Sequence, residues 1–309
     1  MKISFLFPGQ GAQTAGMGAD LFESYPSAEA LFEKAGEIVG YDLKKLCLEG
    51  PEDKLNSTVY SQPAIFTVSA ALLEIFRDRQ PDLVPDVTAG LSMGEYTALY
   101  AAGVVSFEDA LRLVQRRGQA MQEAADTSDG GMVSILGLDE EKVRHLCIEA
   151  AEGQVLEPVN FNCPGQIVIS GQKEACKRAA EMAEKFGAMK AVPLAVAGAF
   201  HTSLMNPAAE KLSQALDRCG IHNPKTTAVI ANIDAQYYPS AAAIRQGLVR
   251  QLVQPILWQK CMERLIAEGI EQFYEIGPGR VLTGLMKRIQ RKIKVINISS
   301  ADAFSALQK

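Results

Sequence analysis

The residue pattern best suited to chemistry surrounds a serine. Ser92 is the centre of Gly90-Leu-Ser-Met-Gly94, between a short apolar strand that begins after Asp86 and a helix-forming run that reaches Ala102. In such a GxSxG elbow the serine occupies a sharp turn, so the positions two residues away on either side must be small. The amides that begin the helix favour developing negative charge. The pattern predicts that Ser92 is a nucleophile; the alternative is a glycine-rich turn in which the serine is incidental.

A nucleophilic serine needs a base, and the chain has three histidines to supply one. His145 belongs to an amphipathic helix predicted over 139–151, and His222 lies in the turn 220–224. His201 instead follows the apolar run 195–200 and precedes a helix, which is where an α/β scaffold presents catalytic groups. We expect His201 to be the base, and the alternative is a half-buried structural histidine.

An arginine lies on the apolar face of a predicted helix. In 106–125 the apolar residues recur at helical spacing, and Arg117 falls among them between Val114 and Met121. No acidic residue of this helix is placed to pair with it. Because a buried, unpaired guanidinium is costly, an anion must reach Arg117. That anion is either a substrate carboxylate held by two hydrogen bonds or an acidic side chain from elsewhere in the fold.

Besides the elbow, six motifs lie along essentially the whole chain: FLFPGQGAQ (5–13), QRRGQAMQEA (115–124), NFNCPGQ (160–166), GAFH (198–201), ANIDA (231–235) and EIGPG (275–279). Together they resemble the motifs of malonyl-CoA:acyl carrier protein transacylases. Their number and order over 309 residues make the resemblance highly specific.

The resemblance implies a ping-pong acyl transfer, in which a serine takes malonyl from coenzyme A and passes it to the phosphopantetheine thiol of acyl carrier protein. It implies that Ser92 is the nucleophile, His201 the base and Arg117 the residue that holds the malonyl carboxylate. The backbone N–H groups of Gln10 and Met93 match those that form the oxyanion hole. No metal or other cofactor is implied.

The resemblance also covers residues around these groups. Gln251 matches the glutamine whose carbonyl orients the histidine, with Gln254 nearby as the alternative position. The further substrate-binding candidates are Met121, Phe200, Asn160 and Asn162. For either asparagine, hydrogen bonding to its own backbone at a strand end is an equally good interpretation. Phe200, beside the base, is expected to limit the room around the acyl α-carbon and so to disfavour branched acyl groups.

One position departs from the family pattern. The family often has histidine directly before the nucleophile, and this chain has Leu91. Leucine cannot donate a hydrogen bond or carry charge. We expect activity to persist, because the nucleophile, the base and the carboxylate anchor all remain.

Composition excludes several classes of protein. With 309 residues, 48% hydrophobic and 22% charged, the chain can bury a sizeable core. The longest apolar runs fall short of the ~20 residues of a membrane span, and the N-terminus is too short for the apolar core of a signal peptide. The six cysteines lack metal-ligand spacing and are typical of reduced thiols in a cytoplasmic protein. The net charge of −5 argues against nucleic-acid binding.

The order of predicted elements indicates an α/β fold in two parts. From 130 to 196 the pattern is βαββαβ, the order of a ferredoxin-like subdomain. The flanking segments alternate strands with helices, as in a hydrolase-like parallel sheet. We therefore predict a large subdomain of residues 1–128 and 197–309, a small one of residues 129–196, and a site in the cleft between them.

A basic run near the C-terminus allows two interpretations. The run consists of Lys287, Arg288, Arg291, Lys292 and Lys294, and it is either a solvated helix face or a docking patch for an acidic carrier protein.

Ser92 and His201 could also serve a hydrolase that discharges acyl groups to water. Arg117 argues against that hydrolase, because simple acyl groups need no anchored cation.

Overall fold

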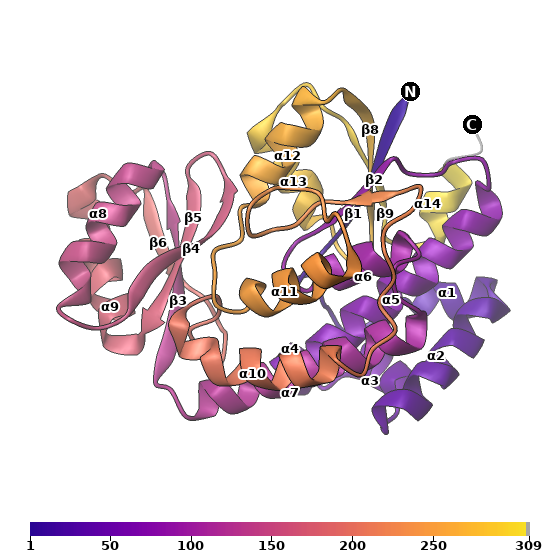
Figure 1. Cartoon of the computed structure of the whole chain (residues 1–309), viewed down its shortest axis with the longest axis horizontal. Helices are drawn as coiled ribbons and strands as arrows, with labels where there is room; N and C mark the ends of the chain where they lie inside the picture. Colours follow the sequence, from indigo (N-terminus) through magenta and orange to yellow (C-terminus); the bar gives the residue numbers. More distant parts are fainter. Residues whose placement is uncertain (307–309) are drawn as a thin grey trace.

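The computed structural model describes residues 1–306 and contains two separate sheets (Figure 1). The larger sheet has five strands, all parallel, in the order β7-β2-β1-β8-β9. Its strands are β1 (Lys2–Phe7), β2 (Val87–Gly90), β7 (Ala228–Val229), β8 (Ile270–Ile276) and β9 (Val295–Ile298). β2 lies between β7 and β1, and Ser92 follows its carboxyl end.

Helices cover both faces of this sheet, and the side chains of β1 show why. Ile3, Phe5 and Phe7 enter one buried cluster, whereas Leu6 enters the cluster on the opposite face, as the alternation of a strand requires. Helices α5, α6 and α7 contribute to the first cluster, and α12 and α13 to the second. The helices of this part are α1 (Ala19–Ser24), α2 (Pro26–Val39), α3 (Leu43–Glu49), α4 (Glu52–Asn56), α5 (Thr58–Arg79), α6 (Gly94–Ala101), α7 (Phe107–Asp126), the 3-10 turn η2 (Ser203–Met205), α10 (Asn206–Leu216), α11 (Ala241–Gln251), α12 (Trp258–Ala267), α13 (Val281–Ile289) and α14 (Ala301–Ala306).

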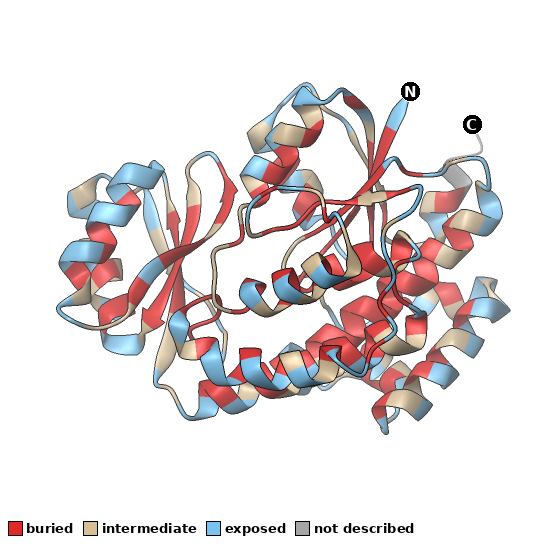
Figure 2. Ribbon diagram, in the orientation of Figure 1, coloured by how far each residue is buried: buried red, intermediate tan, exposed pale blue. Residues whose placement is uncertain are grey.

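Helix α5 corrects one expectation from the sequence. It is long and apolar enough to cross a membrane by length and composition, with a mean hydropathy of 1.3, but 83% of that window is buried inside the molecule. Figure 2 shows α5 almost wholly buried. The sequence reading missed its length because hydroxylated residues such as Ser61, Thr67 and Ser69 interrupt the apolar run. The helix is a central core element that packs against α7 and the sheet.

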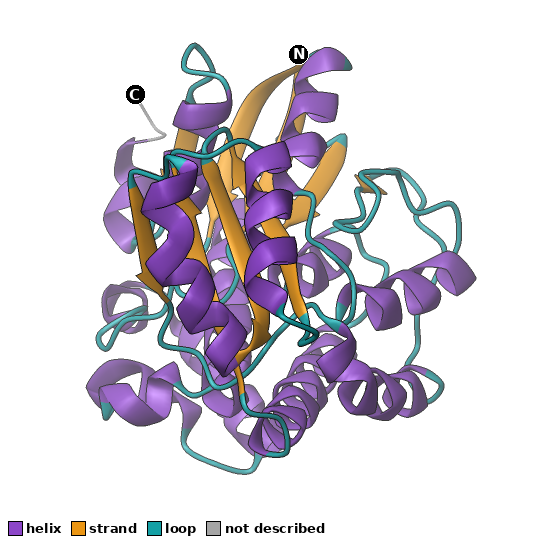
Figure 3. Cartoon of the chain, turned by 90° about the vertical axis from the view of Figure 1, so that its left-hand side faces the viewer, coloured by secondary structure: helices purple, strands orange, loops and turns teal. Residues whose placement is uncertain are grey.

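The smaller sheet is antiparallel, with the order β4-β5-β3-β6, and its βαββαβ connectivity confirms the predicted ferredoxin-like part of this α/β fold. Two helices lie across one face of this sheet (Figure 3). Their buried residues pack with the sheet in a core cluster of its own. The elements are β3 (Gly130–Leu136), α8 (Glu140–Ala151), β4 (Leu156–Cys163), β5 (Gln166–Gln172), α9 (Lys173–Met182), the 3-10 turn η1 (Ala183–Phe186) and β6 (Lys190–Pro193).

The two parts meet along β4. The amide of Phe161 donates to the carbonyl of Ile256 at 2.9 Å, and the amide of Ile256 donates to the carbonyl of Val159 at 2.7 Å. These bonds hold the strand that carries Asn160 against the segment that follows Gln251. All strands of the small sheet fall within 130–193, and the exact subdomain boundaries at 129 and 196 stay a prediction.

Candidate active site

The turn that carries Ser92 requires glycine at positions 90 and 94. Ser92 has a φ of 52°, in the left-handed region that non-glycine residues rarely adopt. A Cβ on Gly90 would lie 2.0 Å from the carbonyl of Gly94, and a Cβ on Gly94 would lie 2.2 Å from the carbonyl oxygen of Phe7. Both contacts are sterically impossible, so the two glycines let the strand turn directly into α6, with the partly exposed serine at the corner.

An asparagine that the sequence reading did not single out fixes this turn. Asn232 Oδ1 accepts a hydrogen bond from the amide of Ser92 at 2.7 Å, and its Nδ2 donates to the carbonyl of Gly90 at 2.8 Å. Asn232 is fully buried and follows β7, the strand next to β2. It lies in the 231–235 motif, which is the only sequence signal that could have identified it.

His201 lies beside the serine, as predicted for a base. Its Nε2 is 3.0 Å from Ser92 Oγ, and its Nδ1 is 2.7 Å from the backbone carbonyl of Gln251. Because a carbonyl can only accept, Nδ1 carries the proton and Nε2 presents its lone pair to the hydroxyl. Burial and the charge of Arg117 lower the pKa of His201 to about 3, so the ring is neutral at physiological pH.

The other two histidines lie away from this serine. His145 is exposed on α8 and pairs with Glu149, one turn further, at 3.0 Å. His222 is exposed in the segment after α10. The geometry therefore brings only His201 of the three to Ser92.

Arg117 reaches the same serine from α7, and its side chain is buried. Its Nη2 donates to Ser92 Oγ and to Gln251 Oε1, each at 3.0 Å, and its Nη1 donates to Gln62 Oε1 at 2.9 Å. The guanidinium has five N–H donors, and Nε has no partner within residues 1–306. Tyr96 lies beneath the guanidinium, with its ring centroid 5.6 Å away.

No carboxylate forms an ion pair with Arg117 among the described residues. The intramolecular salt bridge, the alternative left open by the sequence, is thus not found there. Burial lowers the pKa of Arg117, whereas the nearby Tyr96 and Glu95 act to raise it. A buried cation with unused N–H groups beside a nucleophile is suited to bind an anion.

Two amides are placed to stabilise an oxyanion. Within residues 1–306, neither Gln10 N–H nor Met93 N–H donates to another protein group. Met93 directly precedes α6, and Gln10 lies in the loop after β1. That loop runs tightly against the elbow, because a Cβ on Gly9 would lie 2.3 Å from the carbonyl oxygen of Leu91. Two free N–H groups on adjoining turns are what an oxyanion hole requires.

A cavity of about 460 Å³ opens onto these groups. The predicted site residues among its lining are Gln10, Ser92, Arg117, Met121, Asn160, Phe200 and His201, and Leu91 also lines it. Met93 and Gln251 are buried and are not part of the lining; each offers a backbone group to the site. A smaller cavity of about 240 Å³ between α7 and α10 contains none of these residues.

Asn162 is not part of the cavity lining, contrary to the prediction that both asparagines line it. The pairing of β4 with β5 shifts register between Phe161 and Cys163, so a bulge falls at Asn162 and breaks the alternation that would have placed it with Asn160. Asn162 is buried, and its Oδ1 has no hydrogen-bond partner within residues 1–306.

A buried carboxylate behind the site was missed altogether. Glu95 is fully buried and accepts hydrogen bonds from Tyr238 Oη, from the amide of Asn232 at 2.9 Å and from Gln251 Nε2 at 3.0 Å. Burial raises the pKa of Glu95 to about 7, while the three donors and Arg117 act in the opposite direction. The available signal was that Glu95 is the one charged residue of α6, otherwise an apolar and neutral helix.

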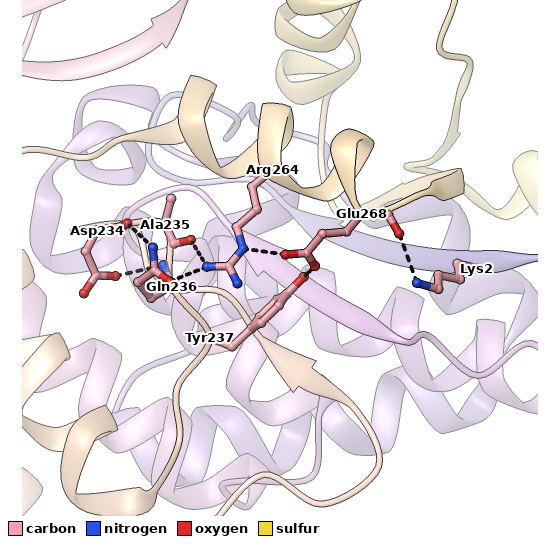
Figure 4. A network of polar contacts seen from close by, with 7 residues as sticks. All are labelled: Lys2, Asp234, Ala235, Gln236, Tyr237, Arg264 and Glu268. Carbon is pink, nitrogen blue, oxygen red and sulfur yellow. Dashed lines mark hydrogen bonds and ion pairs between the residues drawn. The ribbon is translucent and has the colours of Figure 1, made fainter.

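The loop that carries Asn232 is also fixed from its outer side (Figure 4). Arg264 on α12 donates to the carbonyl of Ala235 at 2.7 Å and to Gln236 Oε1 at 2.6 Å. It also pairs with Glu268 at 2.7 Å, and Tyr237 donates to the same carboxylate. The loop is therefore held between a buried network around Glu95 and a partly exposed one around Arg264. Within residues 1–306, no three His, Cys, Asp or Glu side chains gather into a metal-binding group.

Comparison with known proteins agrees over the full length. A model of the acyl transferase domain matches residues 4–309. The malonyl CoA-acyl carrier protein transacylase of Escherichia coli (strain K12) is 46% identical over 305 residues, which are 99% of this chain and 98% of the relative. The enzyme of the same name from Bacillus subtilis (strain 168) is 44% identical over 302 residues, 97% of this chain and 94% of the relative.

Solved structures agree as closely. The malonyl CoA-acyl carrier protein transacylase of Coxiella burnetii has a TM-score of 0.96 at 38% identity, with 99% of this chain and 96% of that chain covered. A malonyl-transacylase in complex with its holo type II PKS acyl-carrier protein has a TM-score of 0.95 at 43% identity, with 99% and 98% covered. With the Ser92 elbow, the His201 pair and the buried arginine already in place, this agreement shows that the chain belongs to the malonyl-CoA:acyl carrier protein transacylase family.

Proposed function

We propose that this protein takes the malonyl group of malonyl-CoA onto Ser92 and passes it to the phosphopantetheine thiol of acyl carrier protein. The observation that carries the proposal is the buried guanidinium of Arg117, which has unused N–H groups and lies 3.0 Å from the nucleophilic oxygen. Malonyl differs from acetyl by one carboxylate, and a buried arginine without a direct acidic partner is a suitable receptor for it.

In the first half-reaction Ser92 Oγ attacks the thioester carbonyl carbon while His201 Nε2 takes the hydroxyl proton. The oxyanion that forms is held by the free amides of Gln10 and Met93, each such donor being worth roughly 100-fold to 1000-fold in rate. As the carbon–sulfur bond breaks, the proton passes from His201 to the sulfur of coenzyme A. The product is a malonyl ester of Ser92.

The second half-reaction reverses these roles. The thiol of the carrier gives its proton to His201, its sulfur attacks the serine ester, and Ser92 leaves with the proton returned by the imidazole. The carbonyl of Gln251 orients the ring but carries no full charge, so it stabilises imidazolium less than a carboxylate would. A thioester is a more reactive acyl donor than an amide, and this weaker pair is sufficient for it.

The cavity lining supports selectivity for an unbranched acyl group. Met121 and Phe200 are both buried and contribute apolar surface beside the arginine and the histidine. A branch on the α-carbon would have to fit against these side chains, and one methylene is worth only about 1 to 3 kcal/mol of discrimination. Asn160 supplies a polar edge, since its Oδ1 has no protein partner within residues 1–306.

We further propose that the acidic carrier protein docks near the basic end of α13. Lys287 and Arg288 are exposed there. Arg288 spans the two parts of the molecule, donating to Gln166 Oε1 at 2.8 Å.

We also propose that the enzyme acts in the cytoplasm, in fatty acid or polyketide synthesis. All six cysteines are buried and unpaired, as suits a reducing compartment.

The test is acylation followed by intact mass measurement. Malonyl-CoA should add one malonyl group, peptide mapping should locate it on Ser92, and Ser92→Ala should abolish the adduct. Addition of holo carrier protein should then move the group to the carrier thiol. An acyl group found on another residue would overturn the assignment of the nucleophile. Release of free malonate at equal rates with and without carrier would favour the hydrolase alternative.

A further inference from the structure

The buried carboxylate of Glu95 is not among the groups that contact substrate in the reaction described above. It lies on α6, three residues after the nucleophile, and the side chain of Gln251 bonds to both Glu95 and Arg117. We propose that Glu95 is a positioning residue for malonyl selectivity: by orienting the Gln251 carboxamide, it holds Arg117 at the nucleophile without forming an ion pair with it. This inference rests on the proposed function.

The orientation of the carboxamide follows from its neighbours. Gln251 Nε2 lies 3.0 Å from Glu95 Oε2 and 3.0 Å from the carbonyl of Ser92, both of which can only accept from it. Its Oε1 lies 3.0 Å from Arg117 Nη2, which can only donate. Turning the amide over would place donor against donor and acceptor against acceptor at all three contacts. Glu95 therefore acts with the Ser92 carbonyl and Arg117 to fix which end of the amide faces the arginine.

Gln251 serves the site with two different groups. Its main-chain carbonyl accepts from His201 Nδ1, and this carbonyl is free to do so because Gln251 is the last residue of α11. Its side chain holds Arg117. One residue thus sets the positions of the base and of the cation, and Glu95 controls only the second of these. A change at Glu95 should therefore alter acyl selectivity more than it alters the base.

The intervening amide matters for charge. Among the described residues, the acid that acts on the charge of Arg117 is Glu95. A direct ion pair would occupy the N–H groups that a malonyl carboxylate needs and would compete with it for the cation. With Gln251 in between, ionised Glu95 offsets the buried positive charge, while the Nε of Arg117 has no partner among residues 1–306. The arrangement balances the cation and leaves it available.

The test measures kcat/KM for loading from malonyl-CoA and from acetyl-CoA at about pH 8, where Glu95, whose pKa burial raises to about 7, is mainly ionised. Glu95→Gln keeps the shape but removes the charge, and should lower the malonyl-to-acetyl ratio by about 10-fold, the effect of losing one charge-assisted hydrogen bond. In an Arg117→Ala background, Glu95→Gln should leave the ratio unchanged, because the two residues act on the same step. Glu275→Gln is the matched control. Glu275 is another fully buried carboxylate of the large part, bonded to the amides of Leu282 and Thr283, and its loss should affect stability but not the ratio.

Each outcome decides between the claims. A wild-type enzyme that loads acetyl as well as malonyl would refute the proposed function itself. A wild-type preference for malonyl that survives in a folded Glu95→Gln would refute only the role of Glu95, as would a further shift in the Arg117→Ala background. If Glu95→Gln does not fold, Gln251→Met decides instead, because it removes the carboxamide and keeps the carbonyl for His201. Its ratio should fall by a similar factor, and an unchanged ratio would refute the inference.

Discussion

Two arginines of this molecule differ in how their charge is satisfied. Arg264 lies near the surface and pairs directly with Glu268, which raises its pKa. Arg117 is buried, and burial lowers its pKa. Its hydrogen-bond partners are the side-chain oxygens of two glutamines and a serine hydroxyl. Arg264 fastens the loop that carries Ala235 to the helix α12 (Figure 4).

The difference indicates what distinguishes a structural cation from a receptor. A carboxylate in direct contact satisfies a guanidinium and leaves little reason to bind another anion. Amide oxygens hold its position without neutralising it. In a buried site the remaining field is strong, because water does not screen it. Arg117 should therefore determine which acyl group is loaded, and Arg264 should not.

The largest expected effect comes from Arg117→Ala. Loading from malonyl-CoA should fall by about 10-fold to 100-fold, because the carboxylate loses charge-assisted hydrogen bonds in a desolvated pocket. Loading from acetyl-CoA should lose nothing comparable, since the oxyanion amides still hold its carbonyl. The measurement is kcat/KM for both thioesters, with thermal melts to confirm folding.

Arg264→Ala is the matched control for that experiment. It should leave the malonyl-to-acetyl ratio unchanged and lower stability by about 1 kcal/mol, as expected for a partly exposed pair with hydrogen bonds. A parallel fall for malonyl and acetyl in Arg117→Ala would mean that Arg117, like Arg264, is structural.

A second variant would give Arg117 a direct acidic partner, like the one that Arg264 has. Gln62→Glu places a carboxylate 2.9 Å from Arg117 Nη1, where the glutamine oxygen now lies. The new ion pair should capture the cation, and malonyl loading should fall by roughly 10-fold while acetyl loading is retained. Gln119→Glu, at a position on α7 where the side-chain oxygen accepts from Arg116 at 3.0 Å, controls for added negative charge. Full malonyl selectivity in a folded Gln62→Glu would contradict the view that direct pairing disables the site.

The pH dependence of His201 gives a third comparison. The pKa of His201 is lowered from 6.5 to about 3, so the unfolded chain binds a proton that the folded protein does not. Stability should therefore decrease as pH falls from about 6.5 towards 3, while the ring stays neutral and active through most of that range. Because Arg117 is a cause of the shift, Arg117→Ala should raise the pKa of His201 and move the acid limb of acetyl loading to higher pH. A limb at the same pH in both proteins would show that burial alone sets the value.

The smallest effect should come from Lys287, which forms no ion pair within the described residues 1–306. Lys287 is exposed at the end of α13, and Lys287→Glu should slow transfer to carrier protein a few-fold at low salt while leaving loading from coenzyme A intact. Arg288 is a poorer choice, because it bonds to Gln166 across the two parts. Equal slowing of both half-reactions would place the docking surface elsewhere.

Much of the fold and part of the site could be predicted from local patterns. The βαββαβ order was readable because each element is short, periodic and bounded by turn residues. Arg117 drew attention because a charge on an apolar stripe is anomalous within its own helix. Gln62 and Asn232 gave no such signal, because their partners lie 55 and 140 residues away and only the folded chain brings them together. The bulge at Asn162 depends on strand pairing, which periodicity does not reveal.

The most direct measurement is a crystal structure of the wild-type enzyme soaked with malonyl-CoA in the absence of carrier protein. We expect a malonyl ester on Ser92 whose carboxylate accepts hydrogen bonds from Arg117, with Gln251 still bonded to both Arg117 and Glu95. An ester whose carboxylate points away, with Arg117 unchanged against Ser92 and the two glutamines, would contradict it.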